Sequence, residues 1–130
     1  MGKSSDCKDN FPEHSGGICP IRDLLARIGD KWSMLVLIAL SHADDDRLRF
    51  SEIMREVDGI SQRMLTSTLR HLERDGILTR HVFPEVPPRV EYELTDRGRD
   101  LLVPVKELVT WISDEWPEIE KSRAQYDAIR

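Results

Sequence analysis

The segment from residue 61 to residue 72 carries side chains that could bind nucleic acid. At helical spacing it presents amide, hydroxyl and guanidinium groups and no carboxylate; this polar stripe consists of Gln62, Arg63, Thr66, Ser67 and Arg70. Arginine can donate two hydrogen bonds to guanine O6 and N7, glutamine can pair with adenine, and hydroxyls can contact base edges or phosphates. The stripe therefore favours contact with DNA. The alternative is an ordinary solvated helix face whose arginines only add solubility.

Local signals predict that the polar stripe lies on a helix. Leu65, Leu69 and Leu72 recur at helical spacing on the opposite side, so we expect them to face the core. Ser61 is a suitable N-cap, and backbone N–H groups at a helix start also favour a phosphate oxygen. Gly76 is suited to the end of the helix. The segment thus has one face for packing and one for a partner.

Two further helices are expected before this one. Pro20 is suited to the first position of a helix that Gly29 ends. Asp30 can cap a second helix over residues 31–42, which is apolar nearly all round and should form the buried centre of the domain. Lys31, at the start of that helix, is a candidate phosphate contact, and plain solvent exposure is the alternative.

Short strands and one short helix complete the middle of the chain. Alternation at 47–50 predicts a small strand, and the next stretch, up to residue 57, predicts a short helix with Ser51 as its cap. Residues 77–83 and 89–95 alternate and are rich in β-branched and aromatic types, and a proline-rich loop separates them. These two segments predict a β-hairpin.

A long helix over residues 96–116 follows, with a kink expected at Pro104 and a polar, acidic tail from Pro117 that could add a turn or two. A short helix, a tight turn, a second helix and a hairpin form a winged helix-turn-helix. The fold class is therefore mainly α (α+β), with the hairpin as a small wing. Arg89, beside the loop prolines, is expected at the tip of the wing, where an arginine could enter a minor groove. An ordinary surface strand residue is the alternative.

Length and charge place limits on the class of protein. A chain of 130 residues is expected to form one domain with its own core. The formal net charge is −5, but residues 47–99 carry +1, so the excess acid lies outside the middle. Because salt screens charges within about 10 Å, an acidic protein can still bind DNA through a local basic face. We see no membrane span and no apolar region of a signal peptide, so we expect a cytoplasmic protein with reduced thiols.

The expected organisation has three parts. Residues 1–17 are polar and aperiodic and are interpreted as a flexible N-terminal arm. Residues 18–116 hold all the predicted elements and should form the DNA-binding and dimerisation domain. Residues 117–130 are interpreted as an acidic C-terminal tail, in part a continuation of the last helix.

Four motifs in order resemble the HxlR-type winged-helix transcriptional regulators. They are the Cys-Pro start and the Gly-x-Lys-Trp step of CPIRDLLARIGDKWSMLVLIAL, the Gly-Ile-Ser-x-x-Met-Leu run of RFSEIMREVDGISQRMLTSTLRHLERDGIL, and the Val-Pro-Pro-x-Val-x-Tyr wing of EVPPRVEYELTDRGRDL. The match ends with ELVTWI and covers the chain from Cys19 to about Trp116. The resemblance implies a homodimeric bacterial regulator that binds a near-palindromic operator in double-stranded DNA, with repression favoured over activation.

In the resembled family the first and last helices build the dimer. The positions of this chain that correspond are Leu24, Leu25, Ile28, Leu108, Trp111 and Ile112. Trp111 lies off the line formed by the apolar residues around it, so the last helix should serve two surfaces. The alternative is that all six residues only close the core of one subunit.

The two cysteines suggest how such a regulator could be controlled. Cys19 precedes Pro20 at a helix start, where the helix dipole favours the thiolate and increases its reactivity. Some members of the resembled family sense oxidants or electrophiles through a cysteine at this position. Cys7, in the arm, is a candidate resolving partner. The alternatives are a small buried apolar residue for Cys19 and an incidental thiol for Cys7.

Other functions find less support in the sequence. Cys7, His14 and Cys19 fit no metal-binding spacing, so we predict no metal and no cofactor. No phosphate loop, nucleophile elbow or Cys-x-x-Cys motif favours an enzyme. Two alternatives stay open: a regulator that responds to a small-molecule effector and has a structural cysteine, and a winged helix used only for protein contacts.

Overall fold

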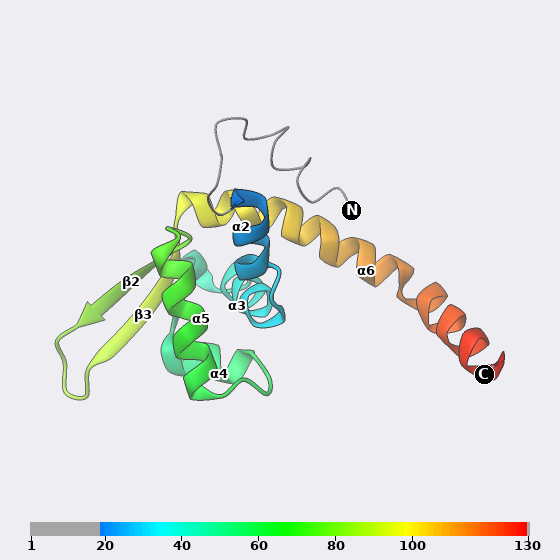
Figure 1. Cartoon of the computed structure of the whole chain (residues 1–130). Helices are drawn as coiled ribbons and strands as arrows, with labels where there is room; N and C mark the ends of the chain where they lie inside the picture. The colour runs from blue at the N-terminus through cyan, green and yellow to red at the C-terminus, as the bar shows by residue number, and fades with distance from the viewer. Residues whose placement is uncertain (1–18, 130) are drawn as a thin grey trace.

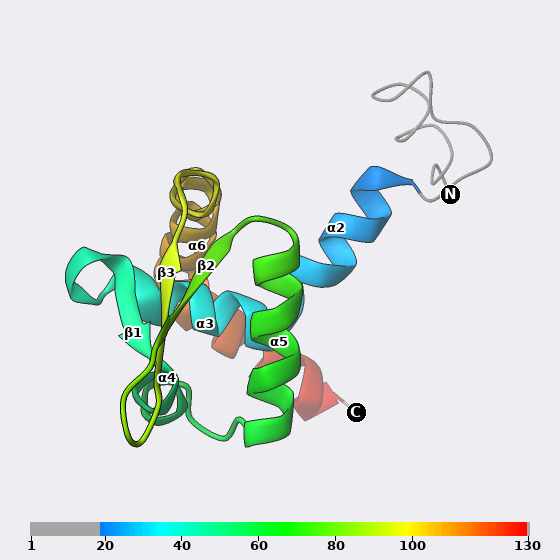
Figure 2. The same ribbon diagram turned by 90° about the vertical axis from the view of Figure 1, so that its left-hand side faces the viewer.

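The computed structural model describes residues 19–129 and has the fold of a winged helix-turn-helix (Figures 1 and 2). Its elements are α2 (Pro20–Ile28), α3 (Lys31–Ser41), the 3-10 turn η1 (Asp44–Asp46), β1 (Arg47–Arg49), α4 (Phe50–Glu56), α5 (Gln62–Arg74), β2 (Leu78–Phe83), β3 (Arg89–Leu94) and α6 (Asp96–Ile129). The short helix α4, the turn, α5 and the hairpin follow one another as predicted. The mainly helical fold class is confirmed.

The hairpin belongs to a three-stranded antiparallel sheet in the order β1-β3-β2. Strand β3 is central, and β1 pairs with one of its edges, where Leu48 lies opposite Tyr92. On the other side of β3, Val82 pairs with Val90 and Phe83 with Arg89. The sheet therefore ties the wing to the segment before α4, and this fixes the wing beside the helix-turn-helix.

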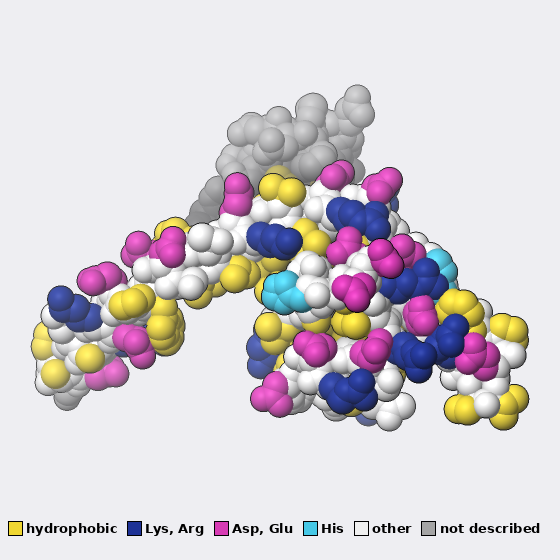
Figure 3. Space-filling model, turned by 180° about the vertical axis from the view of Figure 1, so that it is seen from behind, with side chains coloured by type: hydrophobic (Ala, Val, Ile, Leu, Met, Phe, Trp, Pro, Cys, Tyr) yellow, Lys and Arg dark blue, Asp and Glu magenta, His cyan; other side chains and the backbone are white. Residues whose placement is uncertain are grey.

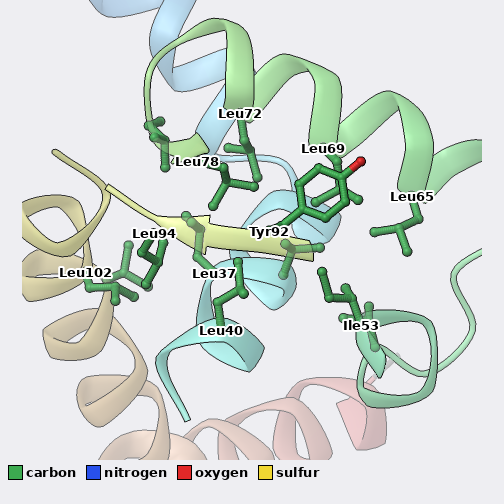
Figure 4. Packing of buried hydrophobic residues seen from close by; sticks show 14 of the residues in the cluster. Leu37, Leu40, Ile53, Leu65, Leu69, Leu72, Leu78, Tyr92, Leu94 and Leu102 are labelled. Atoms are coloured by element: carbon green, nitrogen blue, oxygen red, sulfur yellow. The ribbon is translucent and has the colours of Figure 1, made fainter. Parts of the chain in front are cut away.

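A single hydrophobic core lies between α3, α4, α5, β3 and the start of α6 (Figure 4). Leu37 and Leu40 of α3 are fully buried at its centre, as are Leu65 and Leu69 of α5. The prediction that α3 is the buried centre is thus right for this side of the helix. Leu35, on its other side, is 39% exposed.

The helix starts show where local signals were sufficient. Asp30 accepts a hydrogen bond from the Ser33 backbone N–H at 3.3 Å, so the predicted cap of α3 is confirmed. The prediction that Ser51 caps α4 is wrong. The helix begins at Phe50 with Arg49 as its N-cap residue, and the Glu52 carboxylate accepts the Arg49 backbone N–H at 2.7 Å. Glu52, at the third helical position, thus accepts a hydrogen bond from the free N–H group of Arg49. The N-cap therefore lies two residues earlier in the chain than predicted.

Two helices extend beyond the core. Helix α2 has no buried residue. Helix α6 buries only Gly98, Leu102 and Val105 and then continues to Ile129, well past the turn or two expected after Pro117. Residues 106–129 project from the body as a helix of about 36 Å (Figure 1). No helix in the described part of the chain is long and apolar enough to cross a membrane.

Candidate nucleic-acid interface

The polar stripe lies on the outer face of α5 and lines a shallow groove. Ser61 accepts a hydrogen bond from the Met64 backbone N–H at 3.0 Å, which confirms it as the N-cap. The groove has a volume of 620 Å³ and is lined by Gln62, Arg63, Thr66, Ser67, Arg70 and His71. The leucines on the opposite face are fully buried, so the packing of the core fixes which side of α5 faces out.

The two arginines of the stripe are available to a partner. Neither Arg63 nor Arg70 forms an ion pair with any described residue, and both are exposed. Thr66 differs from them, because its hydroxyl donates to the Gln62 carbonyl at 2.9 Å. The Thr66 oxygen can therefore accept a hydrogen bond from a base or a side chain, while its own proton is already used.

A second, larger cleft of 650 Å³ lies between α5, α4 and the wing. Three arginines from separate elements line it: Arg49 from β1, Arg80 from β2 and Arg89 from β3. Gln62 and Thr66 line the same cleft, so it is continuous with the polar stripe. The sequence analysis missed Arg49 and Arg80, since only the pairing of the strands brings them beside α5.

Tyr92 also lines this cleft. Its side chain is largely buried, and burial raises the pKa of its phenol, so the hydroxyl stays neutral. Its ring belongs to the core, while the cleft above it carries arginine side chains. The cleft thus has a fixed apolar base, and its walls carry three arginines and the Glu85 carboxylate.

Arg89 is placed differently from the expectation of a free cation at the wing tip. Its guanidinium lies 2.9 Å from the Glu85 carboxylate and 3.0 Å from that of Glu91, and it covers the Phe83 ring at 4.1 Å from the ring centre. Arg89 is the first residue of β3 and is partly buried. The residue does line the cleft, but two carboxylates neutralise it.

Glu91 belongs to a network of ion pairs on the outer face of the sheet, where acidic and basic groups alternate (Figure 3). Arg47 contacts Glu91 at 2.6 Å and Glu93 at 3.5 Å, and Glu93 also contacts His81 at 2.9 Å. The hydrogen bond from Arg47 lowers the pKa of the Glu91 carboxyl against the opposing effect of burial. The network thus connects all three strands of the sheet, because Arg47 lies on β1, the two glutamates on β3 and His81 on β2.

Lys31 and Cys19 lie apart from both clefts. Lys31 is exposed, and its ammonium lies 4.5 Å from the centre of the Trp32 ring. Cys19 is the N-cap residue of α2, directly before Pro20, and is half-buried. The described part of the chain holds no free cysteine thiol. Cys7, the other redox candidate, lies outside the described residues.

The residues expected at a dimer interface gather on α2 and α6. Leu24 and Leu25 are 45% and 58% exposed, and Trp111, with Leu108 and Ile112 beside it, is 56% exposed. Hydrophobic side chains follow α6 along its projecting part (Figure 3). Ile28 differs, since it packs against the core. Apolar surface of this extent on α2 and α6 is typical of an interface.

The fold and the exposed polar stripe beside a wing define a winged helix-turn-helix DNA-binding protein. Comparison with known proteins gives the family: residues 27–120 match the HxlR-like helix-turn-helix family, and the chain belongs to it. It is a transcriptional regulator with a helix-turn-helix DNA-binding domain.

Individual relatives agree with this assignment. An HTH-type transcriptional regulator of Methanothermobacter thermautotrophicus is 48% identical over 94 residues, which are 72% of this chain and 70% of that protein. The structure is similar to that of the putative transcriptional regulator ytfH from Salmonella typhimurium, with a TM-score of 0.75 and 38% identity over 82% of this chain and 92% of that one. It is also similar to the redox regulator HypR in its reduced form, with a TM-score of 0.68 and 40% identity over 78% and 98% of the two chains.

Proposed function

We propose that this protein is a cytoplasmic, dimeric regulator that binds a near-palindromic operator and represses by covering a promoter. The observation that carries the proposal is the polar stripe of α5. There Arg63 and Arg70 are exposed and form no ion pair with a described carboxylate, and the buried leucines on the opposite face hold the helix in place. The residues proposed to contact DNA are Lys31, Ser61, Gln62, Arg63, Thr66, Ser67, Arg70 and Arg89. Residues 18–116 form the functional unit, and the acidic segment 117–130 extends its last helix.

Each group of the stripe has a role that its chemistry supports. Arg63 and Arg70 can each donate two hydrogen bonds to guanine, and Gln62 can pair with adenine. Ser61 and Ser67 contact phosphate or sugar, and the start of α5 adds backbone N–H groups that favour a phosphate. From the side of the wing, Arg49 and Arg80 line the cleft and supply further charge for the same backbone.

The dimer is supported by the exposed apolar side chains of α2 and α6. Two copies related by a two-fold axis would present two α5 helices to successive turns of the duplex, which are about 34 Å apart. A shift of α2 or α6 by a few ångströms would alter this spacing. Such a shift could convert a signal into loss of binding.

Two signals have support in different observations. Cys19 caps α2, whose apolar face belongs to the proposed dimer interface, and the similar protein HypR is a redox regulator solved in a reduced and an oxidized form. A small-molecule effector is the second candidate. A cleft of 240 Å³ lies between α2, α3 and α5, and its lining includes Arg27 and Met64 together with Ser67 and His71, which also line the α5 groove. A ligand there would sit directly behind the DNA-reading face.

The experiment that tests the proposal is selection of a binding site from random DNA, followed by titration across a salt series. Arg63→Ala and Arg70→Ala should each weaken specific binding by about 1–3 kcal/mol, and loss of a phosphate contact should reduce the salt slope by about 1. Arg74→Ala is the matched control, because Arg74 is an exposed arginine of α5 outside the groove. Equal affinities of all three variants with wild type would refute the assignment.

The two signals are then separated on the selected DNA. If Cys19 is the sensor, a mild thiol oxidant changes the affinity of wild type that has first been reduced, and Cys19→Ser treated in the same way does not respond. Cys7→Ser distinguishes a resolving partner, because its loss should leave Cys19 sensitive while changing the reversibility of the response. If oxidant has no effect on wild type, the redox assignment fails and the cleft behind α5 becomes the candidate for control.

A further inference from the structure

The tip of the wing is apolar, unlike the rest of the DNA-facing surface. Residues 84–88 are all exposed, and four of the five are proline or valine. Val86 is fully exposed, with 100% of its surface open to solvent. Hydrophobic side chains gather at the end of the wing (Figure 3). An apolar group held at the end of a rigid hairpin indicates a contact with a partner.

Electrostatics at the tip do not favour an arginine inserted into a groove. Arg89 is the cation nearest to the tip in sequence, and its guanidinium is held by Glu85 and Glu91 and by the ring of Phe83. An arginine that enters a narrow minor groove must be free to leave its own carboxylates. In this structure Arg89 instead braces the loop from behind, so its proposed DNA contact is with the phosphate backbone along the cleft and not with the floor of a minor groove.

The location of the tip shows what it faces. The wing tip and the start of α5 lie at the same end of the molecule in both ribbon views (Figures 1 and 2). Val86, Pro87 and Pro88 line the 650 Å³ cleft together with Gln62 and Thr66 of the polar stripe. A duplex that receives α5 in its major groove therefore runs past the tip, which would meet the neighbouring minor groove.

We propose that Val86, backed by Pro87 and Pro88, is an apolar wedge that presses into the minor groove beside the major-groove site and bends the DNA. This inference rests on the proposed function. Apolar side chains of this kind partly unstack a base step and kink the duplex, and steps such as TA or CA deform most easily. The wedge makes affinity depend on the deformability of a step that no polar group of the protein contacts.

A protein partner for the tip is less well supported. The same three residues line the cleft that holds part of the polar stripe, so DNA bound to α5 would cover them. A protein could reach the tip only beside that duplex. The two cases predict different results when DNA shape and transcription are measured separately.

The test compares two exposed valines of the same hairpin. Val86→Ser removes the wedge, while Val82→Ser is the control, because Val82 is 54% exposed on β2 but does not line the cleft. Each variant is titrated with the selected duplex carrying either a TA or an AA step at the flanking position, and the bend is measured by energy transfer between dyes on the DNA ends. Wild type and Val82→Ser should bend the TA duplex and prefer it over AA.

Val86→Ser should bind the TA duplex about tenfold more weakly, with a smaller bend and no preference between the two steps. Wild-type bend and preference in Val86→Ser would overturn the wedge. If that variant bends DNA normally but loses regulation in transcription with purified RNA polymerase, the tip binds protein and the wedge is equally overturned. Failure of wild type to bind any selected duplex would instead reject the DNA-binding function itself, and the wedge with it.

Discussion

Apolar residues at helical spacing line both α5 and α6, yet they lie in opposite environments. On α5, Leu65 and Leu69 are fully buried against α3 and the sheet, and the polar stripe faces outward. On α6, Leu108 and Ile112 are each 44% exposed, and the helix has no other described element beside its projecting part (Figure 1). The apolar face of α5 is fully packed within the core of this chain, whereas that of the projecting part of α6 has no packing partner among the described residues.

The difference shows how the two regions are stabilised. The polar stripe of α5 is rigid because a complete core supports it from behind, so its groups are fixed before any partner binds. A long helix with an exposed apolar face gains most of its stability from packing rather than from helix propensity. In the proposed dimer the projecting part of α6 would therefore pack against the second subunit, and a signal that moves this interface would leave the α5 core intact.

The largest expected effect sharpens this contrast within one residue type. Leu69→Ala should lower the free energy of unfolding by about 2–5 kcal/mol, because it leaves a cavity in a fully buried site. Leu108→Ala should change the stability of the isolated subunit by less than about 1 kcal/mol, since the side chain is already exposed. Urea unfolding at a concentration low enough to give monomer measures both. Similar losses for the two variants would contradict the division into two regions.

Gly98 lies in the first turn of α6, against the sheet, so it tests how firmly the start of α6 is fixed to the core. A Cβ at this position would collide with the Ile77 backbone carbonyl and crowd the Leu94 side chain. Gly98→Ala should therefore cost about 1–3 kcal/mol through overpacking, although alanine is the better helix former. Thermal unfolding is the measurement. An unchanged or higher midpoint would mean that α6 can move away from the sheet at little cost.

How well the sequence predicted each feature of the fold and of the candidate site depends on how far apart the interacting residues lie in the chain. Ser61 and Asp30 were correctly placed as caps, because a cap and the N–H it accepts lie three residues apart. Ser51 was not, since the Glu52 carboxylate accepts the backbone N–H of Arg49, two residues before the expected cap. Local signals at a helix start compete, and the exact position of the cap depends on which side-chain oxygen reaches a free backbone N–H.

Longer-range features were mostly out of reach. Arg49 and Arg80 reach one cleft only because β1 and β2 flank β3, a pairing that no sequence motif specifies. The neutralisation of Arg89 could have been suspected, since Glu85 precedes it by four residues and Glu91 lies two residues on, on the same side of the strand. The contrast between buried and exposed apolar faces was suggested only by the family resemblance and by the offset of Trp111, because periodicity does not report which face finds a partner.

A charge placed in the apolar surface of α6 should break the proposed dimer. Ile112→Asp would put a carboxylate where two subunits meet, and we expect the dimer dissociation constant to rise at least about tenfold, equivalent to 1.4 kcal/mol. The fold should persist, as Ile112 lies outside the core. Analytical ultracentrifugation with circular dichroism checks both points. Asp in place of Val103, which is 61% exposed near the start of α6, is the control for a charge away from the interface residues.

The smallest expected effect is the pH dependence of stability that arises from the ion pairs of the sheet around Glu91. The apolar surface of α6 should contribute no such pH dependence. Because Arg47 lowers the pKa of Glu91 in the folded state, the carboxylate adds stability above its unfolded pKa of about 4.3, and this contribution is lost as pH falls through the folded value. The stability difference between wild type and Glu91→Gln should thus be greatest near pH 6 and shrink below pH 4. For partly exposed ion pairs it should not exceed about 1 kcal/mol. Arg47→Met should reduce the pH-dependent part of the difference, because Arg47 is the largest cause of the lowered pKa, while Arg89, 3.0 Å from Glu91, should retain the rest. A difference that stays constant from pH 6 to pH 3 would mean that Glu91 acts through packing, and that the wing is held to the domain by the core alone.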